Sequence, residues 1–179
     1  MDHTDHLNLI RKGVPNQGGI WAEFGSGRGV FTLALAELIG LDGVIFSVDK
    51  DKRALKEQER GIQERFAGQG PRMHYLVADY TKPLDLPPLD GLLMANALHF
   101  QQDKKSILRA ILEYLSPGGC LILVEYNINR GNPWVPYPIP YKDWEVLSQE
   151  CGFVSTRMLG VRPSRPMREI YSAASDKPI

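Results

Sequence analysis

The sequence predicts an α/β fold in which helices cover both faces of a mostly parallel sheet, giving a three-layer αβα sandwich. Apolar runs rich in β-branched and aromatic residues alternate with helical patterns along nearly all of the 179 residues. The apolar runs are continuous rather than alternating, which indicates strands buried on both faces, as a parallel sheet requires. A chain of this length suits one domain with an ordinary core, so we expect residues 1–179 to form a single domain.

The first half of the chain contains three predicted strands and two predicted helices. The run at 20–24 is followed directly by glycines and then by a segment at 30–40 that is apolar on most sides. The run at 44–48 precedes a charged helical pattern at 51–66. A third apolar run at 74–78 completes this half.

The second half contains the remaining strands and two more helices. Apolar residues at i, i+1, i+4, i+5 and i+8 from Ile107 to Leu115 place one stripe on a helix, which the turn residues at 116–119 end. Four prolines between Asn127 and Tyr141 predict a loop, because proline lacks the N–H donor that helices and central strands need. The other expected elements are strands at 91–95, 120–124, 153 onward and 169–174, and a short helix at 141–151 closed by Gly152.

Composition and charge narrow the classes of function. Lys and Arg together number 21, as do Asp and Glu, so the formal net charge is zero and there is no basic excess to hold a nucleic-acid backbone. No basic segment followed by an apolar run begins the chain, and no stretch of about 18 apolar residues occurs. Cys120 and Cys151 lie in apolar contexts without metal-like spacing, which is typical of buried thiols in a reducing compartment. We therefore expect a cytoplasmic protein with no membrane, metal or nucleic-acid partner, and the sequence favours neither a monomer nor a homodimer.

The strongest local pattern is a glycine turn, residues 23–29, between the first strand and the first helix. Its sequence is Glu-Phe-Gly-Ser-Gly-Arg-Gly, and glycines there let the backbone approach a ligand while the helix N-terminus offers free N–H groups. A dinucleotide fingerprint needs a glycine at the sixth position, where this chain has Val30. Glu23 would also repel a pyrophosphate. An NAD(P)-dependent oxidoreductase is therefore the weaker alternative, and a cationic ligand without phosphates suits the turn better.

An acidic residue followed by Gly-x-Gly-x-Gly resembles the first motif of the class I S-adenosylmethionine-dependent methyltransferases. The order of elements is similar from about Ile20 onward, so the resemblance implies a Rossmann-like sheet of seven strands with an antiparallel last strand. It also implies S-adenosylmethionine as cofactor and S-adenosylhomocysteine as product. The residues that the resemblance places around the methionine part are Gly25, Ser26, Gly27 and Gly29, with Glu23 near its amino group.

Two further acids match the family's pattern for the nucleoside half of the cofactor. Asp49 ends the second strand beside Lys50, where a carboxylate can accept both ribose hydroxyls. The alternative role of helix cap fits Asp51 better. Asp79 follows the third strand, where the resemblance implies an acceptor for the adenine amino group, with Tyr80 packing on the base. An acid that only opens the next loop is the alternative for Asp79.

The segment from Asn96 to Phe100 follows the fourth strand and resembles the family segment that passes beside the methionine and faces the acceptor. Asn96 would contact the cofactor through its backbone. His99 has the residue type and position that suit a general base, should the acceptor have to lose a proton. A packed or surface histidine is the alternative.

The loop from Asn127 to Tyr141 is the predicted acceptor site, because ligands of open α/β sheets bind beyond the carboxyl ends of the strands. Its aromatic residues would form a wall and its polar residues would fix a polar or anionic group, unless the aromatics only cover the sheet edge. The proposed substrate-binding residues are Asn127, Arg130, Trp134, Tyr137 and Tyr141. A second candidate cluster, more typical of a solvated loop, is Arg162, Arg165 and Arg168.

Together these patterns predict a methyltransferase that acts on a small-molecule acceptor by in-line displacement. The patterns that mark amino-nitrogen methylation of bases or glutamine, and cytosine C5 methylation, are absent. An RNA or protein acceptor and an idle cofactor-binding protein are the alternatives. Residues 1–19 form a short leader before the core at 20–179, and its closure over the cofactor is a further hypothesis.

Overall fold

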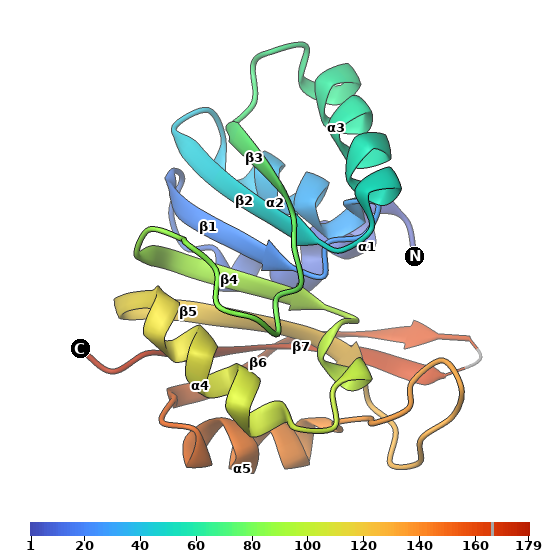
Figure 1. The fold of residues 1–179 in the computed structure, drawn as a ribbon. Coiled ribbons are helices and arrows are strands. Elements are labelled where there is room, and N and C mark those ends of the chain that lie inside the picture. Colours follow the sequence, from blue (N-terminus) through green and yellow to red (C-terminus); the bar gives the residue numbers. More distant parts are fainter. Residues whose placement is uncertain (166) are drawn as a thin grey trace.

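A seven-stranded sheet forms the centre of the molecule, in the order β3-β2-β1-β4-β5-β7-β6 (Figure 1). The computed structural model describes residues 1–165 and 167–179. Strands β1 to β5 pair in parallel, and β7 pairs antiparallel with both β5 and β6. The predicted fold class is therefore confirmed. The strands are β1 (Gly19–Phe24), β2 (Gly43–Asp49), β3 (Arg72–Val77), β4 (Leu89–Ala95), β5 (Leu115–Tyr126), β6 (Val154–Ser164) and β7 (Arg168–Asp176).

Helices cover both faces of this sheet. One face packs against a buried cluster that includes Leu9, Leu35 and Ile62 from three helices, and the other against a cluster that includes Leu108 and Trp144. The first face carries α1 (His3–Ile10), α2 (Val30–Ile39) and α3 (Lys52–Phe66). The second face carries α4 (Lys104–Tyr114) and α5 (Tyr141–Glu150). The chain also forms two short 3₁₀ helices, η1 (Arg11–Gly13) and η2 (Leu98–Phe100). No helix in the described ranges is long and apolar enough to cross a bilayer.

The start of β5 differs from the prediction. The expected turn at 116–119 lies within β5, and Leu115 is already extended and pairs with Leu89 of β4. Helix α4 ends at Tyr114, where Pro117 ahead prevents its continuation. The segment 116–119 is irregular, because the pairing with β4 shifts there from Leu89–Leu115 to Gly91–Cys120 and Gly118 has a φ of 76°. Gly118 N–H donates to Lys177 O at 3.1 Å, and Lys177 N–H donates to Gly119 O at 2.8 Å. The predicted turn residues thus form an irregularity within β5 instead of a break between the helix and the strand.

The N-terminal leader is part of the packed core. Helix α1 lies against α2, β6 and β7, and its Leu9 and Ile10 are fully buried. The hydroxyl of Ser172 on β7 donates to Leu9 O at 2.6 Å, which joins the leader to the far strands of the sheet. The leader thus covers one face of the sheet instead of the carboxyl ends of the strands.

The connection from β3 to β4 runs without a helix at residues 78–88, all of which are described (Figure 1). It runs from β3, at the edge of the sheet, past β2 and β1 to β4, which pairs with β1 on the side opposite β2. Parallel strands in this class of fold are usually joined by a helix. The irregular segment therefore leaves backbone and side chains of Ala78 to Tyr80 at the carboxyl end of the sheet.

Candidate active site

The glycine turn adopts a backbone that other residues rarely take. Gly25, Gly27 and Gly29 have φ values of 73°, 54° and 79°. A Cβ on Gly25 would lie 2.7 Å from Cβ of Ala97, and a Cβ on Gly29 would lie 2.2 Å from Cγ of Gln58. Gly27 faces open space, so only its φ value favours glycine. Two of the three glycines are therefore needed for close packing as well as for the turn.

The turn is joined to the end of β2 by main-chain and side-chain bonds. The N–H groups of Gly25 and Ser26 both donate to Val48 O, at 2.9 and 3.1 Å. The Ser47 hydroxyl lies 2.7 Å from the Ser26 hydroxyl, and both bond the side-chain oxygen of Gln58 on α3. Ser26 was predicted to bind cofactor, and its side chain lies instead within this buried network.

Glu23 lies beneath the turn and is only 2% exposed. It accepts a hydrogen bond from the hydroxyl of Thr32 on α2. Burial raises the pKa of Glu23 to about 8, the Thr32 bond opposes this rise, and the nearby Asp49 adds to it. Glu23 is therefore mostly protonated at neutral pH. It does not line the cavity described next, so its predicted place beside the cofactor amino group stays a prediction.

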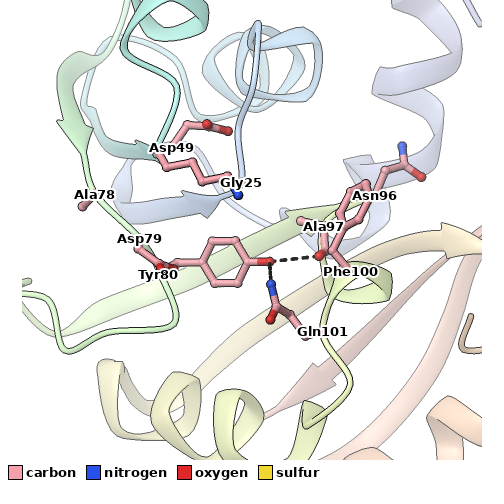
Figure 2. Close-up of a pocket in the computed structure, with 10 residues that line it drawn as sticks. Gly25, Asp49, Ala78, Asp79, Tyr80, Asn96, Ala97, Phe100 and Gln101 are labelled. Carbon is pink, nitrogen blue, oxygen red and sulfur yellow. Dashed lines mark hydrogen bonds between the residues drawn. The ribbon is translucent and has the colours of Figure 1, made fainter. Parts of the chain in front are cut away.

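A cavity of about 280 Å³, here called the strand-end cavity, opens beyond the carboxyl ends of β1 to β4 (Figure 2). Six of the residues predicted to bind cofactor line it, whereas Glu23, Ser26, Gly27 and Gly29 are not among its lining residues. Four lining residues were not predicted; of these, Ala97, Phe100 and Gln101 come from the segment that follows Asn96. The lining residues are Gly25, Asp49, Lys50, Ala78, Asp79, Tyr80, Asn96, Ala97, Phe100 and Gln101.

Asp49 is held firmly at the end of β2. Its carboxylate accepts from Gly27 N–H at 2.7 Å and from Asp51 N–H at 2.8 Å. Asp51 caps α3 by accepting from Arg53 N–H and Ala54 N–H, which confirms that Asp51 and not Asp49 is the helix cap. Asp49 is thus a half-buried acceptor fixed on the cavity wall.

Asp79 and Tyr80 form the neighbouring wall. Asp79 accepts from the N–H and hydroxyl of Thr81, at 2.9 and 2.7 Å, and these bonds hold its pKa below the usual range. Asp79 therefore opens the loop, as its alternative interpretation proposed, while also lining the cavity. The Tyr80 ring stacks on Phe24 with centroids 5.8 Å apart.

The Tyr80 hydroxyl connects the two walls of the strand-end cavity. It donates to Ala97 O at 2.9 Å and accepts from the Gln101 side-chain amide at 3.0 Å. Figure 2 shows the ring reaching from the Asp79 side to these two partners. Burial raises the pKa of Tyr80, so the hydroxyl stays protonated and able to donate at neutral pH.

Asn96 stands where the strand-end cavity meets a second one. It has a φ of 52° and a buried side-chain oxygen with no hydrogen-bond partner among the described residues. Asn96 and Phe100 also line a second cavity of about 450 Å³, here called the loop cavity. Pockets for small molecules commonly span roughly 300–1,000 Å³, so neither cavity alone is large. The other residues of the loop cavity are His99, Tyr126, Trp134, Arg165 and Met167.

His99 is fixed by a carboxylate that sequence reasoning did not single out. Oε2 of Glu125 lies 2.6 Å from Nδ1 of His99, and Oε1 accepts from the His99 backbone N–H at 3.1 Å. Both side chains are almost fully buried, yet His99 lines the loop cavity. The sign in the sequence was an acid at the carboxyl end of an otherwise apolar strand, Leu-Ile-Leu-Val-Glu.

The five predicted substrate-binding residues do not line one cavity. Trp134 lines the loop cavity, whereas Asn127 and Arg130 line a separate hollow of about 390 Å³. Asn127 is a structural link, because its amide bonds Glu169 at 2.7 Å and its oxygen accepts from Tyr141 N–H at 3.1 Å. The five were predicted to form one site, with the aromatics as a wall and the polar residues beside it, whereas these hydrogen bonds hold Asn127 against β7 and the start of α5.

The two tyrosines of that set lie on the sides of the loop. The Tyr137 N–H donates to His99 O at 3.0 Å, and Lys104 lies over the Tyr137 ring at 5.6 Å. The Tyr141 ring packs edge-on against Tyr171, with centroids 5.6 Å apart. Tyr141 therefore covers the sheet, as the alternative interpretation of these aromatics proposed.

The three arginines near the last two strands are also separated. Arg165 lines the loop cavity, Arg168 lines the hollow with Arg130, and Arg162 pairs with Asp5 at 3.2 Å. The predicted cluster is thus wrong, because pairing and the β6–β7 turn send the side chains to different places. Within the described residues, no group of three His, Cys, Asp or Glu side chains is arranged to hold a metal ion.

Comparisons with known proteins agree with this architecture. A family model of the methyltransferase domain matches residues 22–119, more than half of the chain. A protein of Dictyostelium discoideum named "Probable protein-L-isoaspartate O-methyltransferase" is 23% identical over 89% of this chain and 46% of its own length. The chain spans less than half the length of the curated relatives it matches.

Solved structures share the fold at low identity. A SAM-dependent methyltransferase from Methanosarcina mazei has a TM-score of 0.71 and 16% identity, covering 95% of this chain and 97% of that one. Magnesium protoporphyrin IX methyltransferase from Synechocystis, solved with bound SAM, has a TM-score of 0.72 and 15% identity, covering 98% of this chain and 79% of that one.

Proposed function

Since the chain belongs to the class I S-adenosylmethionine-dependent methyltransferases, through their methyltransferase domain, we propose that it transfers a methyl group from S-adenosylmethionine to a small-molecule acceptor. The observation that carries the proposal is the pair of adjoining cavities at the carboxyl edge of the sheet. They share Asn96 and Phe100, so a ligand in one would lie against a ligand in the other.

The strand-end cavity fits this cofactor by the chemistry of its groups. Asp49 offers a fixed carboxylate for ribose hydroxyls, and Asp79 offers one for an amino group. Two carboxylates on one small cavity disfavour a ligand with two phosphates. The glycine turn, with Val30 in place of a third fingerprint glycine, adds to that preference.

The bound cofactor would supply an electrophilic methyl group on a sulfonium, whose transfer leaves a neutral thioether. The protein gains rate mainly by holding the acceptor in line with that group and by excluding water. Phe100 and Asn96 stand at the junction where this alignment is set. His99 would accept a proton from an acceptor that must lose one.

A small-molecule acceptor is favoured by the second cavity and by charge. The loop cavity is a hollow of about 450 Å³ with three aromatic side chains, a shape suited to a compact ligand. A formal net charge of zero gives no general attraction to RNA. The name of the Dictyostelium relative makes a protein carboxylate the competing acceptor.

A cytoplasmic location is part of the proposal. Cys120 and Cys151 are both buried and unpaired in the structure. Burial raises the pKa of Cys120 to about 12, which keeps its thiol protonated and unreactive. Two separate buried thiols suit a reducing compartment.

Differential thermal stabilisation tests the cofactor. S-adenosylhomocysteine should raise the melting temperature, by an amount that grows with the logarithm of its concentration above the dissociation constant, and NAD and NADP should not. The reverse pattern would show an oxidoreductase cofactor. Stabilisation without methyl transfer to any of a broad set of metabolites, RNA or peptides would show an idle binding protein. Mass spectrometry of cell extract metabolites after incubation with labelled cofactor would identify the acceptor.

A further inference from the structure

We infer that the acceptor is a phenolic acid, an aromatic hydroxyl compound that also carries an anionic group, bound in the loop cavity and deprotonated by a His99–Glu125 pair. The inference deepens the proposed function and rests on it. Three features of the loop cavity carry it: a buried carboxylate behind an imidazole, exposed aromatic faces, and an arginine without an acidic partner.

The first feature is the arrangement of Glu125 and His99. Glu125 makes two hydrogen bonds to His99, with Oε2 2.6 Å from Nδ1 and Oε1 3.1 Å from the backbone nitrogen. This fixes the ring and assigns its Nδ1 proton to the carboxylate side, which leaves Nε2 as the acceptor nitrogen. A buried carboxylate also stabilises the imidazolium that forms when Nε2 takes a proton. Glu125 is therefore a positioning residue that makes His99 a base.

The pair serves the transfer of the methyl group from the sulfonium to the hydroxyl oxygen of the acceptor. The acceptor hydroxyl gives its proton to Nε2 of His99, and an oxygen lone pair forms the new bond to the methyl carbon. The electrons of the broken carbon–sulfur bond stay on sulfur, which loses its positive charge. The proton on His99 then leaves to solvent. A nitrogen or thiolate acceptor that is already unprotonated would need no such pair.

The second feature is the aromatic surface of the cavity. Trp134 is 71% exposed and Phe100 is 55% exposed, although both line the cavity. Large aromatic side chains of this exposure bordering one hollow are uncommon on a folded surface and are typical of a binding site. Tyr126 completes the set, with its ring 6.1 Å from that of His99. Flat faces of this kind stack on a planar aromatic ligand.

The third feature is the charge that faces the cavity. Arg165 lines it, and no acidic side chain in the described parts of the chain lies within ion-pair distance of this guanidinium. The charged and titratable groups around His99 are Glu125, Tyr126, Lys104 and Arg165. Glu125 is turned to His99, and Lys104 donates to Gln101 O at 2.8 Å. Arg165 is thus the group available to a carboxylate on the ligand.

Binding of matched probes tests the arginine. With S-adenosylhomocysteine present, we expect 4-hydroxybenzoate to bind more tightly than phenol in calorimetry. Arg165→Gln should weaken 4-hydroxybenzoate roughly 10-fold and leave phenol unchanged, because one charge-assisted bond is lost. Arg162→Gln is the matched control, because Arg162 lies three residues earlier, on β6, and pairs with Asp5 of α1, and this variant should change neither affinity. Equal effects of the two variants would overturn the role of Arg165.

A chromogenic probe tests the base without relying on turnover. Bound 4-hydroxy-3-nitrobenzoate should show its coloured phenolate at a pH below the one at which the free probe ionises. Glu125→Gln should remove this shift, because the imidazolium formed when His99 takes the phenol proton loses its carboxylate partner. A purely structural Glu125 would change stability and leave the phenolate colour of the bound probe unmoved. If Glu125→Gln does not fold, absence of the shift in the wild-type protein still overturns the proposal.

Different results would overturn the methyltransferase function and the phenolic acid acceptor. No stabilisation by S-adenosylhomocysteine would overturn the proposed function itself. Normal stabilisation together with no binding of any hydroxybenzoate would overturn only the phenolic acid. Binding of benzoate as tightly as 4-hydroxybenzoate, with no phenolate formed, would replace the hydroxyl with a carboxylate as the methylated group.

Discussion

The strand-end cavity and the loop cavity share two residues but differ in what holds them in place. The strand-end cavity is framed by the ends of four parallel strands and by a glycine turn bonded to β2 through Val48 O. The loop cavity is lined by Trp134 of the proline-rich loop and by Arg165 and Met167, which lie between the end of β6 and the start of β7. Figure 1 shows the ribbon of this loop and of the two strands. The strand-end cavity is thus formed by residues at the ends of the strands, and the loop cavity is formed largely by residues of separate connecting segments.

This difference places stability and specificity in different parts of the molecule. Groups around the strand-end cavity bond the core: Asp49 bonds the turn, and Ser26 bonds β2 and α3. Changes there should affect folding and cofactor binding together. Trp134 lines the loop cavity alone and is largely exposed, so a change there should affect the acceptor alone, whereas Phe100 borders both cavities. The strand-end cavity is therefore fixed by the fold, whereas the residues of the loop cavity are free to vary.

The largest expected effect on the cofactor side is that of Asp49→Ala. Affinity for S-adenosylhomocysteine should fall about 10- to 100-fold, because hydrogen bonds to a charged group are each worth roughly 1.5–3 kcal/mol. Calorimetry measures it. The neighbour Asp51→Ala is the control, because it removes the cap of α3 at a cost of about 1 kcal/mol in stability and should leave affinity nearly unchanged. Unchanged affinity in Asp49→Ala would refute the ribose assignment.

Two glycine substitutions show how far the turn belongs to the core. Gly29→Ala should lower the free energy of unfolding by about 1–3 kcal/mol, because its φ is 79° and the new Cβ would meet Gln58 at 2.2 Å. Gly61→Ala, in the middle of α3 with open space around it, should raise the free energy by about 0.5–1 kcal/mol. Urea unfolding of both variants measures the difference. Similar values would mean that the turn adapts.

The contrast also explains which parts of the site the sequence could predict. Asp49 is the last residue of β2, and Gly25 and Asp79 follow β1 and β3, so once the strands are located their place at one edge of a parallel sheet is determined. Asn96 follows the same rule directly after β4. These residues could be assigned because each lies at a strand end or within two residues of one.

The loop cavity could not be assembled from the sequence in that way. Trp134, Arg165 and His99 come from three segments whose meeting depends on how the loop folds against the β6–β7 turn. The start of the loop is held by Asn127, which bonds Glu169 on the neighbouring strand β7, 42 residues later in the chain, and no local pattern encodes that bond. Glu125 was missed for a related reason, because an acid in an apolar strand becomes meaningful only when its partner His99 is known. Likewise Ser26, inside a glycine motif, turned inward because Ser47 and Gln58 lie beneath it.

A smaller effect, visible as a pH dependence, is expected from Glu23. Burial raises its folded-state pKa to about 8, above the ordinary glutamate value of 4.5, so its contribution to stability is fully present below about pH 4.5 and is lost as pH rises to about 8. The wild-type free energy of unfolding should therefore fall across this range, by at most about 1.4 kcal/mol per pH unit. Glu23→Gln should remove this slope in urea titrations at several pH values. A persistent slope in the variant would assign the pH dependence to another group.

The smallest expected effect on the fold is that of Trp134→Ala, and this variant tests whether the loop cavity acts independently of the strand-end cavity. Because Trp134 is 71% exposed, its removal should change the free energy of unfolding by less than about 0.5 kcal/mol and leave S-adenosylhomocysteine binding intact. Trp144→Ala is the contrasting control, since Trp144 is fully buried and its truncation should cost about 3–5 kcal/mol. Loss of cofactor affinity in Trp134→Ala would show that the two cavities act as one site, and the acceptor loop would then have to be counted as part of the cofactor-binding fold.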